Sequence, residues 1–176
     1  MKPVSYMKQI ELLNKKFDAE KLLDIYESLD NDAYQICFTD RPGKHSLDDG
    51  VGSIFDYHPC SEWDWSELNP MFHNTYLEEV YQEIKKDYII GRARFMTMGP
   101  TNRALTYHYD SGHRLHIPIQ TNPHSWFIQQ DETLYNMDQL GSLYILDAYQ
   151  YHSALNLDRS GSKRVHLVFS AEKNLK

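Results

Sequence analysis

The sequence predicts a mainly β fold, a barrel or sandwich that is braced by helices near the N-terminus. Aromatic residues make up 13% of the 176 residues, and the 13 tyrosines in particular favour a pleated sheet. Two early stretches carry apolar residues at helical spacing, and short apolar stretches separated by turn residues fill most of the second half. No repeat or linker interrupts the chain, so we expect one domain over 1–176, with a supporting part (1–87) and a metal-binding β-core (88–171).

Charge and hydropathy narrow the functional classes. The formal net charge is −7 and the isoelectric point is about 5.7, which disfavours binding to a phosphate backbone, so no nucleic-acid partner is expected. No apolar run is long enough to span a bilayer and no secretory leader pattern is present, so we expect a cytoplasmic protein without a membrane partner. Cys37 and Cys60 show no CxxC spacing and are expected to be free thiols.

The N-terminal part of the chain predicts a strand, a helix and a second strand. Residues 4–17 alternate loosely and predict a first strand with a ragged start. Asp18 is a good N-cap, and the apolar residues that follow it predict an amphipathic helix over 19–29. Residues 34–39 predict a short strand.

Residues 40–73 lack clear periodicity and form an unusually long connection. Its aromatic residues, Phe55, Tyr57, Trp63 and Trp65, argue against disorder. Two interpretations remain open. The segment is either a cover over a substrate pocket or a satellite apolar cluster that fixes the loop in place.

The second half of the chain predicts one more helix followed by many strands. Asn74 is the expected N-cap of a helix whose apolar face contains Leu77, Val80, Tyr81 and Ile84. The expected strands are 88–98, 104–109, 114–120, 125–129, 142–147, 151–155 and 163–170.

Six of the nine histidines lie between positions 108 and 166, and three residues in this stretch form a candidate metal site. On a strand, residues two apart project from the same face, so His108 and Asp110 point together while Tyr109 points away. His152 is the best candidate for a third ligand. Two histidines and one carboxylate on one face leave the opposite face open, as expected for non-heme Fe(II) that also binds a co-substrate and dioxygen.

Arginines in apolar surroundings accompany these ligands. Arg164 lies in an apolar strand, and Arg114 shares a face with His116 against apolar neighbours. A guanidinium group matches a carboxylate bidentately, so one or both arginines are candidates for binding the distal carboxylate of a small dicarboxylic acid. The alternatives are that both arginines pair with internal acids, and that Arg159 in the preceding loop is the anion ligand.

These residues resemble the 2-oxoglutarate- and Fe(II)-dependent dioxygenases, and more narrowly their aspartyl/asparaginyl β-hydroxylase branch, which includes proline-hydroxylase-like enzymes. The similar segments are His108-x-Asp110, Arg114-Leu115-His116-Ile117-Pro118-Ile119, Gly141 with Leu143 to Asp147, His152-Ser153-x-x-Asn156 and Arg164-Val165-His166-Leu167-Val168. Some β-hydroxylases of this branch lack a carboxylate ligand where this chain has Asp110. That difference favours a three-ligand site and the amino-acid-hydroxylase side of the branch.

The resemblance implies a double-stranded β-helix, or jelly roll, like that of the cupins. It implies Fe(II) on His108, Asp110 and His152, and 2-oxoglutarate on Arg164 with Arg114 and His116 contributing. It also implies hydroxylation of a C–H bond of an amino acid, or of an Asp, Asn or Pro side chain in a peptide or protein, with release of succinate and CO2 and with ascorbate as an optional reductant. Asn156 and Trp126 are candidate substrate contacts, by family position and adjacency.

Two other classes of protein remain compatible with the pattern. A cupin-like isomerase or hydrolase would hold Zn or Mn in the same three ligands and would not need Arg164. A binding module on the same barrel would have a structural metal or none. Of the remaining histidines, His113 and His124 are expected at the surface or in structural roles, and His166 either lines the pocket or packs in the core.

Overall fold

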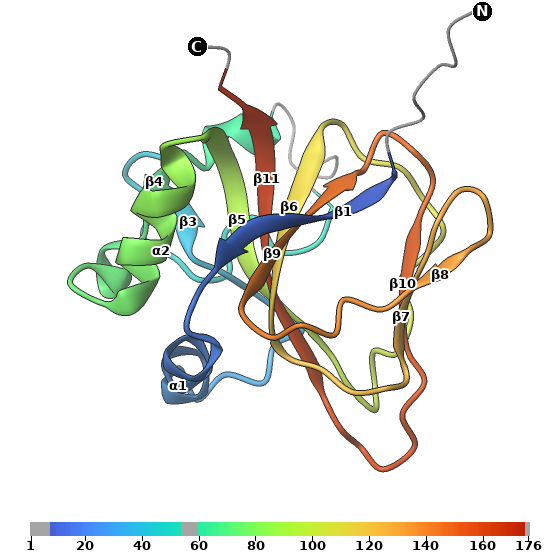
Figure 1. The fold of residues 1–176 in the computed structure, drawn as a ribbon. Helices are drawn as coiled ribbons and strands as arrows, with labels where there is room; N and C mark the ends of the chain where they lie inside the picture. The colour runs from blue at the N-terminus through green and yellow to red at the C-terminus, as the bar shows by residue number, and fades with distance from the viewer. Residues whose placement is uncertain (1–7, 54–59, 175–176) are drawn as a thin grey trace, which may run out of the picture.

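A computed structural model describes residues 8–53 and 60–174 of the chain. Its largest feature is a six-stranded antiparallel sheet (Figure 1). In spatial order the sheet contains β1 (Ile10–Lys16), β9 (Ser142–Asp147), β6 (His113–Gln120), β11 (Arg164–Lys173), β5 (Tyr88–Met98) and β2 (Gln35–Cys37). The fold is therefore mainly β, as the sequence predicts, and the segment before Tyr88 contributes two strands to this sheet as well as helices.

Two helices cover one face of the six-stranded sheet. They are α1 (Ala19–Ser28) and α2 (Tyr76–Lys85), which lie together on the left of the sheet in Figure 1. Their apolar sides, which include Leu22 and Tyr81, pack in one buried cluster with the sheet residues Phe95, Leu167 and Phe169. Because side chains alternate along a strand, the neighbours of these sheet residues must project from the opposite face.

That opposite face looks toward a second, three-stranded sheet. It consists of β10 (Ser153–Asn156), β7 (Ser125–Ile128) and β8 (Leu134–Tyr135), on the right in Figure 1. A smaller apolar cluster that includes Phe127, Tyr144 and Leu146 packs between the two sheets. The inward residues of β5, β6 and β11 are unusually polar, and this is where the candidate site lies.

The long connection between β2 and α2 contains short elements in its described parts. These are β3 (Thr39–Asp40), which pairs with β4 (Glu67–Leu68), and the 3₁₀ turns η2 (Glu62–Asp64) and η3 (Pro70–Phe72). Trp65 is fully buried, while Gly52 and Ser53 line a cavity. The described connection thus combines features of both interpretations, an anchoring apolar residue and a pocket wall. Phe55, Tyr57 and Pro59 lie outside the described residues.

Most predicted elements are found close to their expected bounds. The strands 88–98 and 142–147 are confirmed at both ends, and α1 begins after Asp18, whose carboxylate accepts hydrogen bonds from the backbone of Glu20 and Lys21. The first strand begins at Ile10, and its predicted start at 4–7 lies outside the described residues. β8 was not anticipated, because its two residues lie in a polar segment without alternation.

Two expectations were wrong. Asn74 is not the N-cap of α2; Thr75 holds that position, and Asn74 adopts a left-handed backbone with φ of 61° and donates its N–H to the side chain of Glu78. Residues 104–109 do not form a continuous strand; they make isolated bridges at Ala104 and His108. Asn tolerates the left-handed region better than most residues, which explains its place just before the helix.

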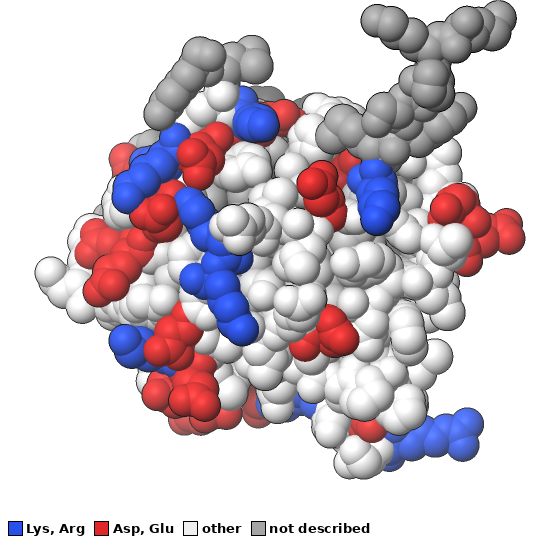
Figure 2. All heavy atoms as spheres, viewed as in Figure 1, with Lys and Arg blue, Asp and Glu red and all other residues white. Residues whose placement is uncertain are grey.

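Several whole-molecule features complete the description. Cys37 and Cys60 are both free thiols, as expected. Acidic and basic side chains are interspersed over the face drawn in Figure 2. Within residues 8–53 and 60–174, no helix is long and apolar enough to cross a membrane.

Gly91 on β5 provides a test of how η2 is seated. A Cβ atom at this position would lie 2.4 Å from the backbone oxygen of Glu62, so only glycine lets η2 approach the sheet so closely. We expect Gly91→Ala to lower the free energy of unfolding by about 1–3 kcal/mol through overpacking. Gly99→Ala is the matched control, because the nearest atom to its added Cβ is 3.8 Å away. Urea unfolding followed by tryptophan fluorescence measures both, and equal stabilities would refute this account of the packing.

Candidate active site

His108, Asp110 and His152 come together in the structure, as the sequence predicts. One ligand atom from each residue lies within 4.8 Å of the other two. The Nε2 atoms of His108 and His152 are 3.9 Å and 3.8 Å from Oδ2 of Asp110. His152 is buried, whereas the side chains of His108 and Asp110 are partly exposed, so the cluster opens to one side.

Backbone hydrogen bonds hold these three residues in place. The N–H of His108 donates to the carbonyl of His152, and the N–H of His152 donates back to His108, at 3.0 and 2.8 Å. The N–H of Asp110 donates to the carbonyl of Ala148. The two histidines are thus directly opposed across an antiparallel bridge, and Asp110 is fixed independently of them.

The donor set fits a divalent metal ion. Nδ1 of His108 lies 2.6 Å from the carbonyl of Thr106, and Nδ1 of His152 lies 3.0 Å from that of Gln150. A carbonyl accepts only from a protonated nitrogen, so in the neutral form of each ring the proton is on Nδ1 and the lone pair is on Nε2, which faces Asp110. Burial lowers the pKa of His152, which keeps its imidazole neutral and available as a ligand. Two nitrogens and one carboxylate oxygen suit Fe(II) with open positions.

Glu62 is a buried carboxylate that organises the wall next to this cluster. Its oxygens accept hydrogen bonds from Nε and Nη2 of Arg92 at 2.9 and 2.8 Å, from Arg114 at 3.3 Å, and from Oγ of Ser170 at 2.7 Å. Burial alone would raise the pKa of Glu62, but the attraction of Arg114 and Arg92 outweighs it and holds the pKa at about 2. Glu62 is therefore ionised over the whole physiological range of pH.

Arg114 differs from what the sequence suggested. Its guanidinium contacts Glu62 at 3.3 Å and Oδ2 of Asp110 at 3.4 Å, and it also donates to the backbone carbonyls of Ser111 and His113. Pairing with internal acids, the alternative interpretation, thus describes Arg114. Its role in this geometry is to link Asp110 to Glu62, and it has little capacity left for a ligand carboxylate.

Arg164 fits the expected anion clamp. Its side chain is buried, and no acid pairs with it among the described residues. Its guanidinium contacts the sulfur of Met98 at 3.2 Å and Nδ1 of His166 at 3.0 Å, and it lies 4.8 Å from the ring centroid of Phe127. Burial lowers its pKa to about 9, so the group stays protonated at neutral pH, without a contacting acid in the part of the chain that the structure describes.

His116 also lines this region with unmet hydrogen-bonding capacity. Both of its ring nitrogens are buried and have no hydrogen-bond partner within residues 8–53 and 60–174. Burial, and then the positive charge of Arg164, hold its pKa well below the ordinary value, so the ring is neutral. His166 next to Arg164 is similarly neutral and has an unpaired Nε2. Buried polar atoms without partners in a folded protein usually mark the place of a ligand or of ordered water.

A cavity of about 550 Å³ connects these groups. Its lining includes the three candidate metal ligands together with Arg164, Arg114 and His116. It also includes residues that the sequence analysis did not single out, namely Glu62, Arg92, Arg94 and Phe127. The volume is in the range of small-molecule sites.

The remaining candidates lie outside this cavity. The side chain of Asn156, at the end of β10, is buried and donates hydrogen bonds to the carbonyls of Met98 and Ser162. Trp126 alternates with Phe127 on β7, and it is Phe127 that reaches the cavity. Neither residue lines the cavity, and their expected contact with substrate stays a prediction. Arg159 and His124 are exposed, and His113 pairs with Glu172 at 3.4 Å.

The missed arginines had a detectable signal. Arg92 and Arg94 alternate with Gly91, Ala93 and Phe95 in an apolar strand, which is the same feature that singled out Arg164. Glu62 had no comparable signal, because it follows an aperiodic segment and reaches its partners only through the fold.

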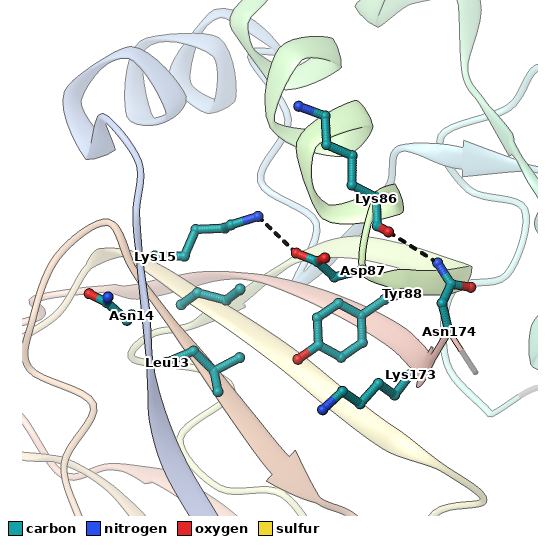
Figure 3. Close-up of a pocket in the computed structure, with 9 residues that line it drawn as sticks. Leu13, Asn14, Lys15, Lys86, Asp87, Tyr88, Lys173 and Asn174 are labelled. Atoms are coloured by element: carbon teal, nitrogen blue, oxygen red, sulfur yellow. Dashed lines mark hydrogen bonds and ion pairs between the residues drawn. The ribbon is translucent and has the colours of Figure 1, made fainter. Parts of the chain in front are cut away.

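A second, more open hollow of about 280 Å³ lies at the other end of the large sheet (Figure 3). Lys15 projects over it but pairs with Glu83 at 2.9 Å and with Asp87 at 3.1 Å. Asn174 closes the rim by donating to the backbone carbonyl of Lys86. The hollow contains no cluster of metal ligands or unpaired buried charge, so we assign the site to the larger cavity.

Comparison with known proteins extends the description of the fold. No family model matches the chain, and no curated protein matches it in sequence. A viral collagen prolyl hydroxylase from Paramecium bursaria Chlorella virus-1 is similar in structure, with a TM-score of 0.52 and 10% identity over 93% of this chain and 91% of that chain. A 2OG-Fe(II) oxygenase family oxidoreductase from Burkholderia pseudomallei has a TM-score of 0.52 and 12% identity over 93% and 85% of the two chains. This chain therefore shares its fold with these two structures.

The low pKa of Glu62 generates a prediction about stability and pH. Its folded pKa of about 2 lies below the ordinary value of 4.5, so its contribution is complete above pH 4.5 and is lost as the pH falls toward 2. Glu62→Gln should lower the free energy of unfolding at pH 7 by about 3 kcal/mol. It should also reduce the acid limb, which is the fall in that free energy between pH 4.5 and 2. Chemical unfolding at several pH values measures this, with the exposed Glu67→Gln as control. An unchanged acid limb would show that the two arginines do not stabilise the Glu62 carboxylate.

Proposed function

We propose that this chain is an Fe(II)- and 2-oxoglutarate-dependent dioxygenase. The reaction hydroxylates a C–H bond of an amino acid, or of an Asp, Asn or Pro side chain in a peptide. In balance, substrate R–H, dioxygen and 2-oxoglutarate give R–OH, succinate and CO2. The observation that carries the proposal is the buried Arg164, which has no acidic partner among the described residues and lines the same cavity as the His108, Asp110 and His152 cluster.

Each part of the cavity has a role in this scheme. His108, Asp110 and His152 hold Fe(II), which when bound supplies the redox chemistry that couples decarboxylation of 2-oxoglutarate to hydroxylation. Arg164 binds the distal carboxylate of 2-oxoglutarate, and the neutral His116 donates one hydrogen bond toward it. Phe127 and the surrounding apolar residues exclude water, which strengthens the guanidinium–carboxylate attraction. Arg114 orients Asp110.

The finer classification is also a proposal. The two facing antiparallel sheets, with the ligands between them, support a double-stranded β-helix. The segment Arg114-Leu115-His116-Ile117-Pro118 supports the aspartyl/asparaginyl β-hydroxylase branch, on its amino-acid-hydroxylase side. A cupin-like isomerase or hydrolase would gain nothing from a desolvated Arg164, so the dioxygenase is favoured over it.

The metal ligands provide the first test. His108→Ala should weaken Fe(II) binding by more than about 100-fold, because only two ligands remain. Under nitrogen, wild-type protein with Fe(II) and 2-oxoglutarate should show a weak visible charge-transfer band that requires both components. The band should be absent from His108→Ala and present in His124→Ala, a change at an exposed histidine outside the cavity. If His108→Ala retains metal and releases succinate, the ligand set is wrong.

Arg164 provides the second test. Arg164→Met keeps the length and apolar packing of the side chain but removes its charge. Losing a buried bidentate pair costs about 2–4 kcal/mol, so the Kd for 2-oxoglutarate should rise by about 30- to 1,000-fold. Calorimetric titration under nitrogen measures it, with the exposed Arg159→Met as the matched control. An unchanged Kd in Arg164→Met would remove the clamp from the proposal.

A further inference from the structure

We infer that Arg94 is a second carboxylate-binding residue, and that the hydroxylated substrate is a small carboxylic acid anchored by it. The inference rests on the proposed function and names the substrate class for the same cavity. It follows from a buried guanidinium whose hydrogen-bonding capacity and charge the fold leaves unmet.

Arg94 projects from β5 into the cavity and is only 6% exposed. The one hydrogen bond described for its side chain is from Nη1 to Oε1 of Gln35, at 2.9 Å. Its Nε is buried without a partner, and no acid pairs with it among the described residues. Burial, and then repulsion by Arg92, lower its pKa to about 10, so it remains charged at neutral pH. A buried cation without an anion is costly unless a ligand supplies the anion.

Gln35 presents Arg94 toward one side of the cavity. Its Oε1 also accepts a hydrogen bond from the backbone N–H of Gly52 at 3.0 Å, so Gln35 is held between β5 and the loop. Tyr34, Gly52 and Ser53 line the same cavity. Arg94 is therefore seated against β2 and the long connection.

Arg94 and Arg164 are held against different elements of the cavity wall. Arg94 pairs in register with Val168 on β11, four residues from Arg164, which separates their Cα atoms by about 13 Å. A five-carbon diacid is about as long as two extended residues, roughly 7 Å. Arg164 also lies over Phe127 of the second sheet, whereas Arg94 bonds to Gln35 on β2. These separate anchors favour a separate anion for each guanidinium.

The excess positive charge of the cavity lining also favours an anionic substrate. The described lining residues include four arginines but only two acids, Glu62 and Asp110. Glu62 and Asp110 contact Arg92 and Arg114, so neither Arg94 nor Arg164 has an acid in contact among the described residues, and Glu62 acts on Arg94 only from a distance. A divalent metal and a dianionic co-substrate add no net charge, so the lining keeps an excess of two positive charges. Once the distal carboxylate of the co-substrate engages Arg164, Arg94 is the guanidinium left without a contacting anion, and a carboxylate on the substrate would supply one and lower the excess charge.

The volume limits the size of this anion. About 550 Å³ must hold the co-substrate and the part of the substrate next to the metal, so a free amino acid or another small carboxylic acid fits best. A peptide whose reacting residue carries no carboxylate would leave Arg94 buried and unpaired.

The experiment separates substrate binding from co-substrate binding. Wild-type protein with Fe(II) and 2-oxoglutarate is screened for succinate release with the twenty common L-amino acids and with internal peptides whose termini are blocked. Any amino acid that responds is compared with its carboxamide. Binding of the acid and of 2-oxoglutarate is then measured separately under nitrogen by calorimetry, in wild type, Arg94→Met and Arg94→Lys, so that no turnover is needed.

We expect at least one free acid to respond, and its carboxamide to bind about 30-fold more weakly or worse. Arg94→Met should lose about the same factor for the acid while its Kd for 2-oxoglutarate stays within about twofold. Arg94→Lys keeps the charge but not the planar fork, so its Kd for the acid should lie between those of wild type and Arg94→Met. This variant also provides the test if Arg94→Met does not fold. Arg159→Met should resemble wild type.

Three outcomes overturn the inference while leaving the dioxygenase in place. In the first, the acid and its carboxamide bind with the same Kd. In the second, Arg94→Met or Arg94→Lys raises the Kd for 2-oxoglutarate instead of the Kd for the acid. In the third, succinate release is stimulated only by blocked peptides, or by no free acid. Failure of wild-type protein to bind 2-oxoglutarate is a different result, because it removes the proposed function itself.

Discussion

The carboxylate of Glu62 is the constraint on which the cavity wall depends, since it joins β5, β6 and β11 through Arg92, Arg114 and Ser170. A buried carboxylate is tolerated only when every lone pair is used, and here two guanidiniums and a hydroxyl use them. Arg114 transmits this order to Asp110 at 3.4 Å. Glu62 therefore positions Asp110 through Arg114, although Glu62 is not itself a candidate metal ligand.

The polar inner face of the large sheet lines the candidate site, and its apolar outer face packs against the helices and stabilises the fold. On β11, Val165, Leu167 and Phe169 pack under the helices, while Arg164 and His166 face the interior. The desolvation cost of the charges on the inner face is offset by the continuous apolar cluster that the outer face buries. Arg94 and Arg164 concentrate the remaining unbalanced charge at the two places where ligands are proposed to bind.

Sequence patterns predicted most of the scaffold, because strands and helices follow local periodicity. The strand 88–98 and both helices needed only alternation and spacing. The meeting of His152 with His108 and Asp110 rested instead on residue type and on the family resemblance. What failed depended on long-range contacts. Glu62 follows an aperiodic segment, and the pairing that occupies Arg114 with internal acids is set by the fold. Arg94 carried the same signal as Arg164, but nothing local distinguishes an arginine that an acid neutralises from one left unpaired.

The reciprocal hydrogen bonds between the backbones of His108 and His152 have a consequence for assembly of the centre. They cross-link the two ligand-bearing segments through main-chain atoms, independently of any ion. Were a metal ion to bind here as proposed, little conformational entropy would remain to be lost, so more of the coordination energy would appear as affinity. Loading and loss of that ion would then be a local exchange reaction, with the surrounding sheets remaining folded.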